Sequence, residues 1–439
     1  MSGIPEFERR EPDGNVYSRW SWDGRAVELQ QSRFGMHPLY CWAQPDGIAL
    51  ADSPLSLLGL GAPPELDEAA IATFLRLGFF LGEDTPFRSV RAVPADARLT
   101  WSARDGLRVE RPARSPPRAS GLTRAEAIEA HIELTRAAVL RCLPQEDYVM
   151  PLSGGCDSRH LLLELCRAGR PPRHCVTAQM LPDRANDDTT VARQLCTALG
   201  LRQQVVRQPL SLVGAVRRKN RLTGLCCSEH SWAVPLVETL RRQTRLLVDG
   251  IAGDVLTTCF LITPERIGLC ERGDIRNLAQ SLLGDTELGL SLMLSPAARR
   301  RFGRELAVER LSQALEPHLA LPNALSSFSL ANRTRREIEL YTYAMYGPEV
   351  KVLAPYLDET LVDMLLATPQ AWFADGCFHQ DTIRRAFPVQ AAIPFASSGP
   401  ARKCRPMAVL AAPTARGPAG VRCGLPAGHA CRGHGKRLA

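Results

Sequence analysis

The residues best suited to chemistry form one short stretch, Ser153-Gly154-Gly155-Cys156-Asp157-Ser158. Apolar residues 148–152 precede it and predict a buried strand, while residues 160–166 follow it with helical spacing. The two glycines let backbone N–H groups turn inward at a helix start, which makes a site for an anion such as phosphate. Asp157 would repel that anion unless a divalent cation lay between them, so the stretch predicts a magnesium–nucleotide site. The alternative is a tight strand–helix connection capped by Ser153 or Asp157.

A second stretch, Asp249-Gly250-Ile251-Ala252-Gly253-Asp254, begins at the last residue of another predicted buried strand, residues 246–249. Its glycines permit close backbone approach, and its last carboxylate can face a cation. We expect Asp157 and Asp254, one from each stretch, to hold Mg²⁺ between the oxygens of a leaving pyrophosphate. The alternative is an Asp-Gly turn in which Asp254 caps the next helix.

A third segment, residues 347–358, is less informative by itself. Glu349 is either an acid–base group or a salt-bridge partner, and Lys351 has the character of a solvated surface charge. From these residues alone, a salt-bridge role for Glu349 and a surface role for Lys351 are favoured over a catalytic one.

Strands and helices alternate around the two glycine-containing stretches. Residues 173–179 and 203–207 are strand-like and flank a helix at residues 187–200, and residues 286–346 are mainly helical. This alternation predicts a parallel, doubly wound α/β sheet. Ligands bind at the carboxyl ends of the strands in such sheets, which is where both stretches fall.

The first 110 residues predict a separate β-rich domain. Runs at residues 15–22, 26–31 and 38–43 are accompanied by Asp-Gly turn signals at residues 23–24 and 46–47, and residues 67–77 are expected to form a helix with Asp67 as its N-cap. A Pro- and Ser-rich linker covers residues 111–121. Thr123 and Glu126 then form a capping box that starts a helix to about residue 142. We therefore expect domains at residues 1–110 and 122–396.

Residues 397–439 differ in composition from the rest of the chain. They are rich in Gly, Pro, Ala and Arg without periodicity, which predicts a disordered tail. Their eight Lys and Arg residues, with no Asp or Glu, account for the whole net charge of +8. Residues 1–396 are therefore neutral, and no specific nucleic-acid partner is expected. One set of possible zinc ligands in the tail has a spacing that matches no usual zinc site, so no zinc is expected there: Cys423, His429, Cys431 and His434.

Length and composition place the chain among ordinary globular proteins. Its 439 residues allow two or three domains, and 45% of them are hydrophobic and 23% charged. The first 15 residues are polar, and no apolar run is long enough to cross a bilayer, so neither a signal peptide nor a membrane span is expected. Fourteen cysteines without disulfide-like spacing favour the reducing cytoplasm.

The three segments, in this order, resemble the motifs of the asparagine synthase family: Ser-Gly-Gly-x-Asp-Ser, Gly-Glu-Gly-x-Asp-Glu and Glu-x-Arg-x-Pro-Phe-Leu-Asp. The first match is complete. In the second, Gly250 and Asp254 match, whereas Ile251 and Val255 replace the glutamates and Ala252 replaces the middle glycine. The third keeps Pro355, Leu357 and Asp358, with Tyr356 in place of Phe. Near the amino terminus, Arg33-Phe34-Gly35-Met36-His37-Pro38-Leu39-Tyr40 resembles the family's Arg-Phe-Gly-x-x-Pro-Leu-Tyr.

The resemblance implies an adenine-nucleotide α-hydrolase-like (PP-loop) synthetase domain with ATP and Mg²⁺ as cofactors. Such an enzyme converts a carboxylate into an acyl-adenylate, releases pyrophosphate, and forms an amide when an amine displaces AMP. Asp157 and Asp254 would serve as magnesium ligands and catalytic residues, and Glu349 as the candidate base. Glu349 lies two residues before the position of the family's glutamate, which Lys351 occupies in an ungapped alignment. The residues implied to bind ATP and pyrophosphate are Ser153, Gly154, Gly155, Asp157, Ser158, Asp249, Gly250 and Gly253.

Members of this family that hydrolyse glutamine begin Met-Cys, whereas this chain begins Met1-Ser2-Gly3, and Cys41 inside a strand is no substitute. The resemblance therefore implies a reduced, inactive amidotransferase-like N-terminal domain. It points to the branch of β-lactam synthetases and lasso-peptide macrolactam synthetases. The expected substrates are a small-molecule or peptide carboxylate and amine, and a precursor peptide and a protease are candidate partners. Lys403 is the only lysine in range of the family's late phosphate-site lysine, and no role is assigned to it.

Three alternatives remain at this point. One is an asparagine synthetase that uses ammonia or a partner glutaminase. Another is a non-catalytic relative, although both aspartates are present. The third is a different ATP pyrophosphatase, which the match near the amino terminus disfavours.

Overall fold

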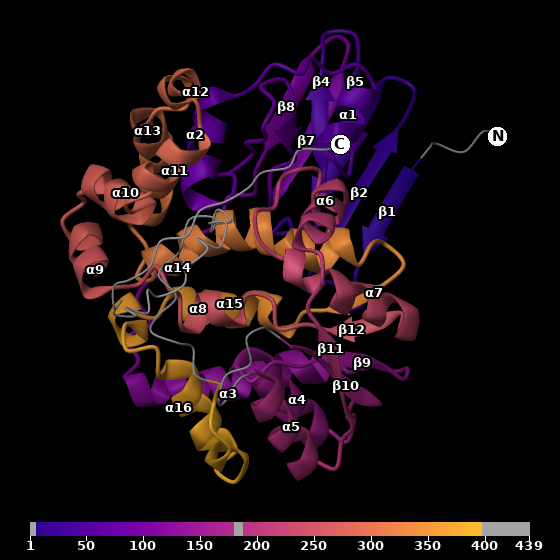
Figure 1. Cartoon of the computed structure of the whole chain (residues 1–439), viewed down its shortest axis with the longest axis vertical. Helices are drawn as coiled ribbons and strands as arrows, with labels where there is room; N and C mark the ends of the chain where they lie inside the picture. The colour runs from indigo at the N-terminus through magenta and orange to yellow at the C-terminus, as the bar shows by residue number, and fades with distance from the viewer. Residues whose placement is uncertain (1–5, 180–187, 397–439) are drawn as a thin grey trace, which may run out of the picture. The chain divides into compact units, whose positions relative to one another are not determined.

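The computed structural model describes residues 6–179 and 188–396, and all of these belong to one compact unit. The expectations for residues 397–439, including the four zinc-type residues and Lys403, lie outside the described residues. The described part combines antiparallel sheets near the amino terminus with parallel strands and many helices (Figure 1). This confirms the mixed α/β class.

Two antiparallel sheets build the first 110 residues. The larger one has the order β1 (Glu6–Arg10), β2 (Tyr17–Trp22), β3 (Ala26–Gln31), β7 (Ala97–Ser102) and β8 (Gly106–Glu110). The smaller one has the order β5 (Ile48–Ala51), β4 (Tyr40–Ala43) and β6 (Arg91–Ala92). Apolar side chains such as Leu29, Leu99 and Cys41 pack together between the sheets. The expected runs at residues 15–22, 26–31 and 38–43 correspond to β2, β3 and β4, whereas β1 and β5 were not expected.

Helix boundaries in this region follow the capping signals. After α1 (Pro54–Gly59), Asp67 accepts a hydrogen bond from the amide of Ala70 and starts α2 (Glu68–Leu77). Residues 111–123 contain neither helix nor strand, and they are anchored by a hydrogen bond from the backbone N–H of Ser120 to the carbonyl of Ala367. The capping box of Thr123 and Glu126 then opens α3 (Arg124–Arg141), as predicted.

The parallel strands place both glycine-containing loops at one edge. Strands β11 (Gln203–Arg207), β10 (His174–Gln179) and β9 (Val149–Pro151) pair in that order, and β12 (Leu246–Val248) pairs with β13 (Lys351–Leu353). Because β12 lies alongside β9, the spatial order is β11-β10-β9-β12-β13. The chain leaves β9 toward one side and returns on the other, so a topological switch point lies between β9 and β12.

Helices cover both faces of these strands, which explains the uninterrupted apolar runs. Met150, Cys175 and Val248 share a core with α4 (Asp157–Arg167) and α5 (Asp188–Ala198). Their sequence neighbours Val149, Val176 and Leu247 share a second core with α6 (Leu212–Leu222) and α7 (Val234–Gln243). Figure 1 shows the strands between α4 and α5 on one side and α7 on the other.

The remaining residues are mostly helical, as expected for residues 286–346. Leu330–Ile338 (η3) and Leu340–Met345 (η4) are π-helical, a rare conformation that often occurs at functional sites. No helix within residues 6–179 and 188–396 combines the length and apolar character needed to cross a membrane. The other α-helices are α8 (Gly253–Thr257), α9 (Pro264–Glu271), α10 (Ile275–Leu283), α11 (Glu287–Met293), α12 (Pro296–Arg301), α13 (Arg304–Leu315), α14 (Ala324–Ser329), α15 (Glu359–Leu366) and α16 (Phe378–Ala386).

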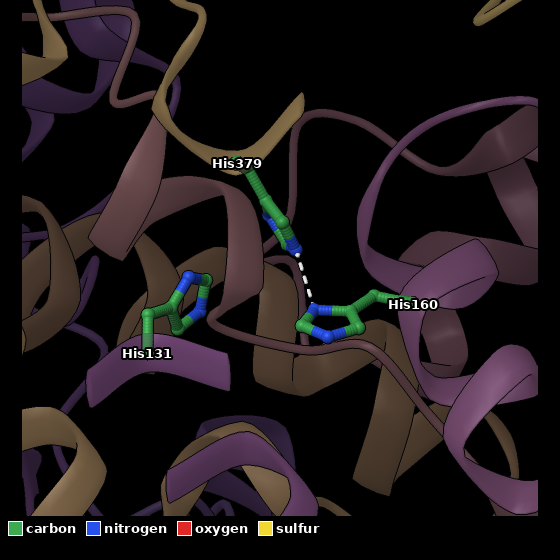
Figure 2. Close-up of side chains that lie close together, drawn as sticks. All are labelled: His131, His160 and His379. Atoms are coloured by element: carbon green, nitrogen blue, oxygen red, sulfur yellow. Dashed lines mark hydrogen bonds between the residues drawn. The ribbon is translucent and has the colours of Figure 1, made fainter. Parts of the chain in front are cut away.

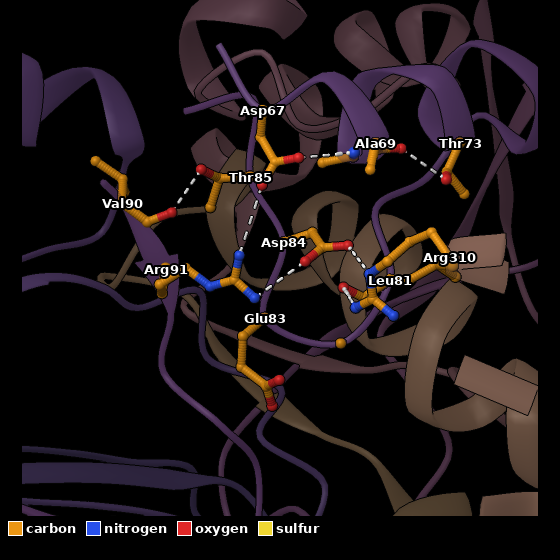
Figure 3. A network of polar contacts seen from close by, with 12 residues as sticks. Asp67, Ala69, Thr73, Leu81, Glu83, Asp84, Thr85, Val90, Arg91 and Arg310 are labelled. Carbon is orange, nitrogen blue, oxygen red and sulfur yellow. Dashed lines mark hydrogen bonds and ion pairs between the residues drawn. The ribbon is translucent and has the colours of Figure 1, made fainter. Parts of the chain in front are cut away.

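A buried carboxylate ties the N-terminal region to the helical part. Asp84 is 3% exposed and accepts hydrogen bonds from Arg91, at 3.0 Å, and from Arg310 of α13, at 2.7 Å (Figure 3). Its backbone carbonyl also accepts from Arg336 of η3, at 2.7 Å. Two guanidinium groups therefore compensate the buried charge, as burial of an ion requires.

The turn after β1 protects the open edge of β13. Glu11 accepts the amide of Val352 and Asp13 accepts the amide of Ala354, each at 2.8 Å. Two N–H groups that face away from β12 are thus satisfied by side chains. The N-terminal region therefore fixes the strand that leads into the third sequence motif.

Candidate active site at the strand switch point

The two glycine-containing loops meet through Asp157, the first residue of α4. A Cβ placed on Gly253 would lie 2.7 Å from Cγ of Asp157, and one placed on Gly250 would lie 3.0 Å from its Cβ. Only glycine leaves space for the carboxylate at this distance, because real Cβ contacts are longer. The structure therefore brings the first two predicted motifs into direct contact.

The first loop is closed by its own side chains. The amide of Ser153 donates to Oγ of Ser158 at 3.0 Å, and the amide of Gly155 donates to Oγ of Ser153 at 3.2 Å. Gly154 is packed so tightly that an added Cβ would lie 2.6 Å from Cβ of Ala396 and 2.9 Å from that of Val191. The loop sequence is thus explained by tight packing and by hydroxyl acceptors for backbone amides.

One backbone amide of this loop already donates a hydrogen bond to a carboxylate of the protein. The N–H of Gly154 donates to Oδ1 of Asp188 at 2.8 Å, so a carboxylate stands where a phosphate oxygen would accept the same bond. Cys156, the N-cap of α4, makes no side-chain capping bond. A helix start that no N-cap side chain covers, next to an amide that binds a carboxylate, fits the expected anion site.

The second loop has an unusual backbone. The amide of Ile251 donates to Oδ1 of Asp249 at 2.8 Å, and Ala252 adopts a left-handed conformation with φ of 75°. An alanine in this region is strained by about 1 kcal/mol. Glycine, which the motif resembled by this loop has at the position of Ala252, carries no such strain. The loop then starts α8 at Gly253 and places Asp254 in its first turn.

The three aspartates of these loops influence one another. Burial, followed by the charge of Asp157, raises the pKa of Asp249 to about 6. Crowding by surrounding protein groups, followed by the charge of Asp157, likewise raises the pKa of Asp254 to about 6, although part of its side chain remains open to solvent. Carboxylates that disfavour each other's ionisation fit a divalent cation, whose charge would reverse the effect.

Asp157 rests on a buried imidazole that sequence reasoning missed. His379 of α16 is fully buried, and its Nδ1 lies 3.2 Å from Oδ1 of Asp157 and 3.0 Å from Oγ1 of Thr257. The hydroxyl of Thr257 donates to the carbonyl of Gly253, so the network assigns the His379 proton to Nδ1. His379 therefore donates toward Asp157 and orients its carboxylate.

His379 belongs to a cluster of three buried imidazoles from α3, α4 and α16 (Figure 2). Nε2 of His379 lies 3.1 Å from Nδ1 of His160 and 3.3 Å from the hydroxyl of Tyr356. Burial lowers the pKa of His131 and that of His160 well below the usual value, so both rings are neutral. His131 and His160 are therefore uncharged and pack against His379, which contacts Asp157.

The third motif is brought to the site only in part. Tyr356 follows β13 and donates to the backbone carbonyl of Asp157 at 3.4 Å. Glu349, the expected base, precedes β13, is exposed, and pairs with Arg245 at 2.9 Å. Because β13 runs parallel to β12, residues before it lie at the amino ends of the strands, opposite the loop of Asp249–Asp254. The structure therefore does not bring Glu349, the expected base, to the site of Asp157.

Among the residues that the structure adds, Tyr356 had a usable signal in the sequence, since it lies in the third motif. Asp188, Thr257 and His379 had none, because their helices carry no motif that links them to Asp157. No protein-family model matches the chain, and no curated protein matches it significantly. The chemistry of this site is therefore inferred from its geometry and from the motifs.

Proposed function

We propose that this protein is an ATP-dependent amide-bond-forming enzyme of the asparagine synthase type. It would activate a carboxylate as its acyl-adenylate, releasing pyrophosphate, and an amine would then form the amide and release AMP. The observation that carries the proposal is the seating of Asp157 against Gly250 and Gly253 at the strand switch point. It unites the first two motifs of the resemblance at the edge where nucleotides bind in open α/β sheets.

The residues present fit Mg²⁺ and ATP. Asp157 and Asp254 would hold the cation, with Asp249 beneath, and the bound cation would neutralise charge on the leaving pyrophosphate. The Gly154 amide and the start of α4 would bind phosphate oxygens, which requires Asp188 to give up its bond to Gly154. His379 and Thr257 would keep the Asp157 carboxylate oriented before the nucleotide arrives.

The N-terminal region supports the proposal that the substrate, and not glutamine, supplies the amine. Cys41 is the only cysteine among residues 1–110, and it is 4% exposed. Burial raises its pKa to about 11, so the thiolate needed to attack glutamine is scarce at neutral pH. We therefore propose macrolactam formation, or a related ring closure on a substrate that carries both groups, as the class of reaction.

The test uses the full chain with Mg²⁺, ATP and a panel of peptides that carry an internal Asp or Glu and a free amino terminus. We expect a peptide of this class to elicit AMP and pyrophosphate in equal amounts. Asp157→Asn and Asp254→Asn should each lower this release by about 10²-fold or more, with an unchanged circular dichroism spectrum. ADP and phosphate as the only products, or near-normal turnover in either variant, would refute the proposal.

A further inference from the structure

A second group of potential metal ligands lies in the loop between α6 and α7. Cys227 and His230 come from this loop, and Glu337 reaches them from the π-helix η3. All three side chains are buried, with residue exposures of 2%, 8% and 1%. None of them belongs to the site described above.

The ligand atoms are spaced as around a tetrahedral ion. Sγ of Cys227 lies 3.3 Å from Oε1 of Glu337 and 3.8 Å from Nδ1 of His230, and Nδ1 lies 3.9 Å from Oε1. Zinc bonds of about 2.3 Å to sulfur and about 2.1 Å to nitrogen and oxygen place tetrahedral ligands about 3.4–3.6 Å apart. The largest difference between these spacings and the observed ones is about 0.5 Å, which requires only small side-chain rotations.

We propose that Cys227, His230 and Glu337 bind a zinc ion, with a solvent molecule as the fourth ligand. Thiolate, imidazole and carboxylate are the donors that zinc selects, and one thiolate with one carboxylate balances its charge. His230 is held for this role by stacking on Tyr341, with ring centroids 5.2 Å apart. The ring of His230 therefore keeps its Nδ1 directed at the other two ligands.

Neighbouring charges and hydrogen bonds compete with metal binding at this group. Lys219 is buried and donates to the carbonyl of Cys227, so a cation already lies nearby. Glu337 accepts the amides of Ser228, at 3.1 Å, and Glu229, at 2.8 Å, which leaves lone pairs for a metal. Without an ion, the thiol of Cys227 would donate to Glu337 or to the carbonyl of Glu229, 3.2 Å away. A metal-free hydrogen-bonded loop is thus the competing arrangement.

The loop has features of an ordered functional segment. Leu225 and His230 both adopt left-handed backbone angles, with φ of 66° and 65°, a strain that the surroundings must enforce. Glu229 pairs with Arg333 at 3.3 Å, and the charge of Arg333 acts on Asp254. An ion at Cys227 would therefore brace the loop that positions this arginine near the strand switch point.

The test measures the metal content of the full, untagged chain by inductively coupled plasma mass spectrometry. We expect about one zinc per chain in the unmodified protein and almost none in Cys227→Ala or His230→Asn. Asparagine is chosen because it tolerates the left-handed backbone of His230. Cys226→Ala is the matched control, because Cys226 is equally buried but its thiol donates to the carbonyl of Gly224. This control should keep its zinc.

Cobalt gives a second readout. Co²⁺ added to the metal-free protein should produce a sulfur-to-cobalt charge-transfer band that is absent from Cys227→Ala. If Cys227→Ala does not fold, retention of the band in a Cys423→Ser, Cys431→Ser double variant supports the site. The proposal is overturned if the unmodified protein shows neither zinc nor the band. It is also overturned if folded Cys227→Ala keeps its zinc, or if the double variant loses the band. Amide synthesis and zinc binding are measured separately, so either can fail without the other.

Discussion

Replacement of Gly253 by alanine tests the contact that carries the proposed function. The added Cβ would lie 2.7 Å from Cγ and 2.9 Å from Oδ1 of Asp157, and 2.9 Å from Cε2 of Tyr356. Gly253 starts α8, and its backbone lies outside the left-handed region, so alanine is allowed there by backbone conformation. The perturbation therefore acts on the Asp157 carboxylate and the Tyr356 ring.

Stability and activity should respond very differently to Gly253→Ala. Overpacking of this kind costs about 1–3 kcal/mol. Alanine in a helix recovers up to about 1 kcal/mol relative to glycine. We therefore expect a net loss of about 0–3 kcal/mol in the free energy of unfolding. A carboxylate displaced by a large fraction of an ångström should instead lower the rate by about 10²-fold, because the cation would be misplaced.

The assay compares urea unfolding with AMP and pyrophosphate release in the same preparations. Gly268→Ala in α9 is the matched control, because its Cβ would meet only the flexible end of Arg272, at 3.1 Å. That variant should be as stable as the unmodified protein, or up to about 1 kcal/mol more stable, with full activity. Unchanged product release in Gly253→Ala would show that the Asp157 contact is not part of the catalytic geometry.

Three further outcomes are expected. The pKa of Asp254 is about 6 in the fold, against about 3.9 when unfolded, so its charge destabilises the metal-free protein above pH 6, and this cost disappears toward pH 4. Asp254→Asn should accordingly raise the melting temperature in EDTA at pH 7.5 but not at pH 4; an equal shift at both would contradict the coupling. Glu349→Ala should leave product release unchanged and alter stability by less than about 1 kcal/mol, because its ion pair with Arg245 is exposed. Labelled glutamine should yield no glutamate with or without ATP, because Cys41 is buried; ATP-dependent release at the rate of product formation would instead favour asparagine synthesis.

Much of the fold follows from local signals in the sequence. Asp67 and the Thr123–Glu126 capping box mark helix starts because their side chains bond to amides only two or three residues away. The parallel strands are recognisable because burial on both faces requires uninterrupted apolar residues. The contact between the first two loops was expected as well, since each follows a strand whose carboxyl end must lie at the same edge.

Tertiary structure decided which distant residues complete the site. Glu349 and Tyr356 belong to one motif, but β13 lies between them, so only Tyr356 reaches Asp157. Where that strand begins depends on its pairing with β12 and on the side chains that cover its other edge, which no local pattern encodes. His379 is separated from Asp157 by more than two hundred residues, and Glu337 from Cys227 by more than one hundred. Such contacts arise from helix packing, so the sequence predicts the two loops of the candidate site but not the side chains that pack against them.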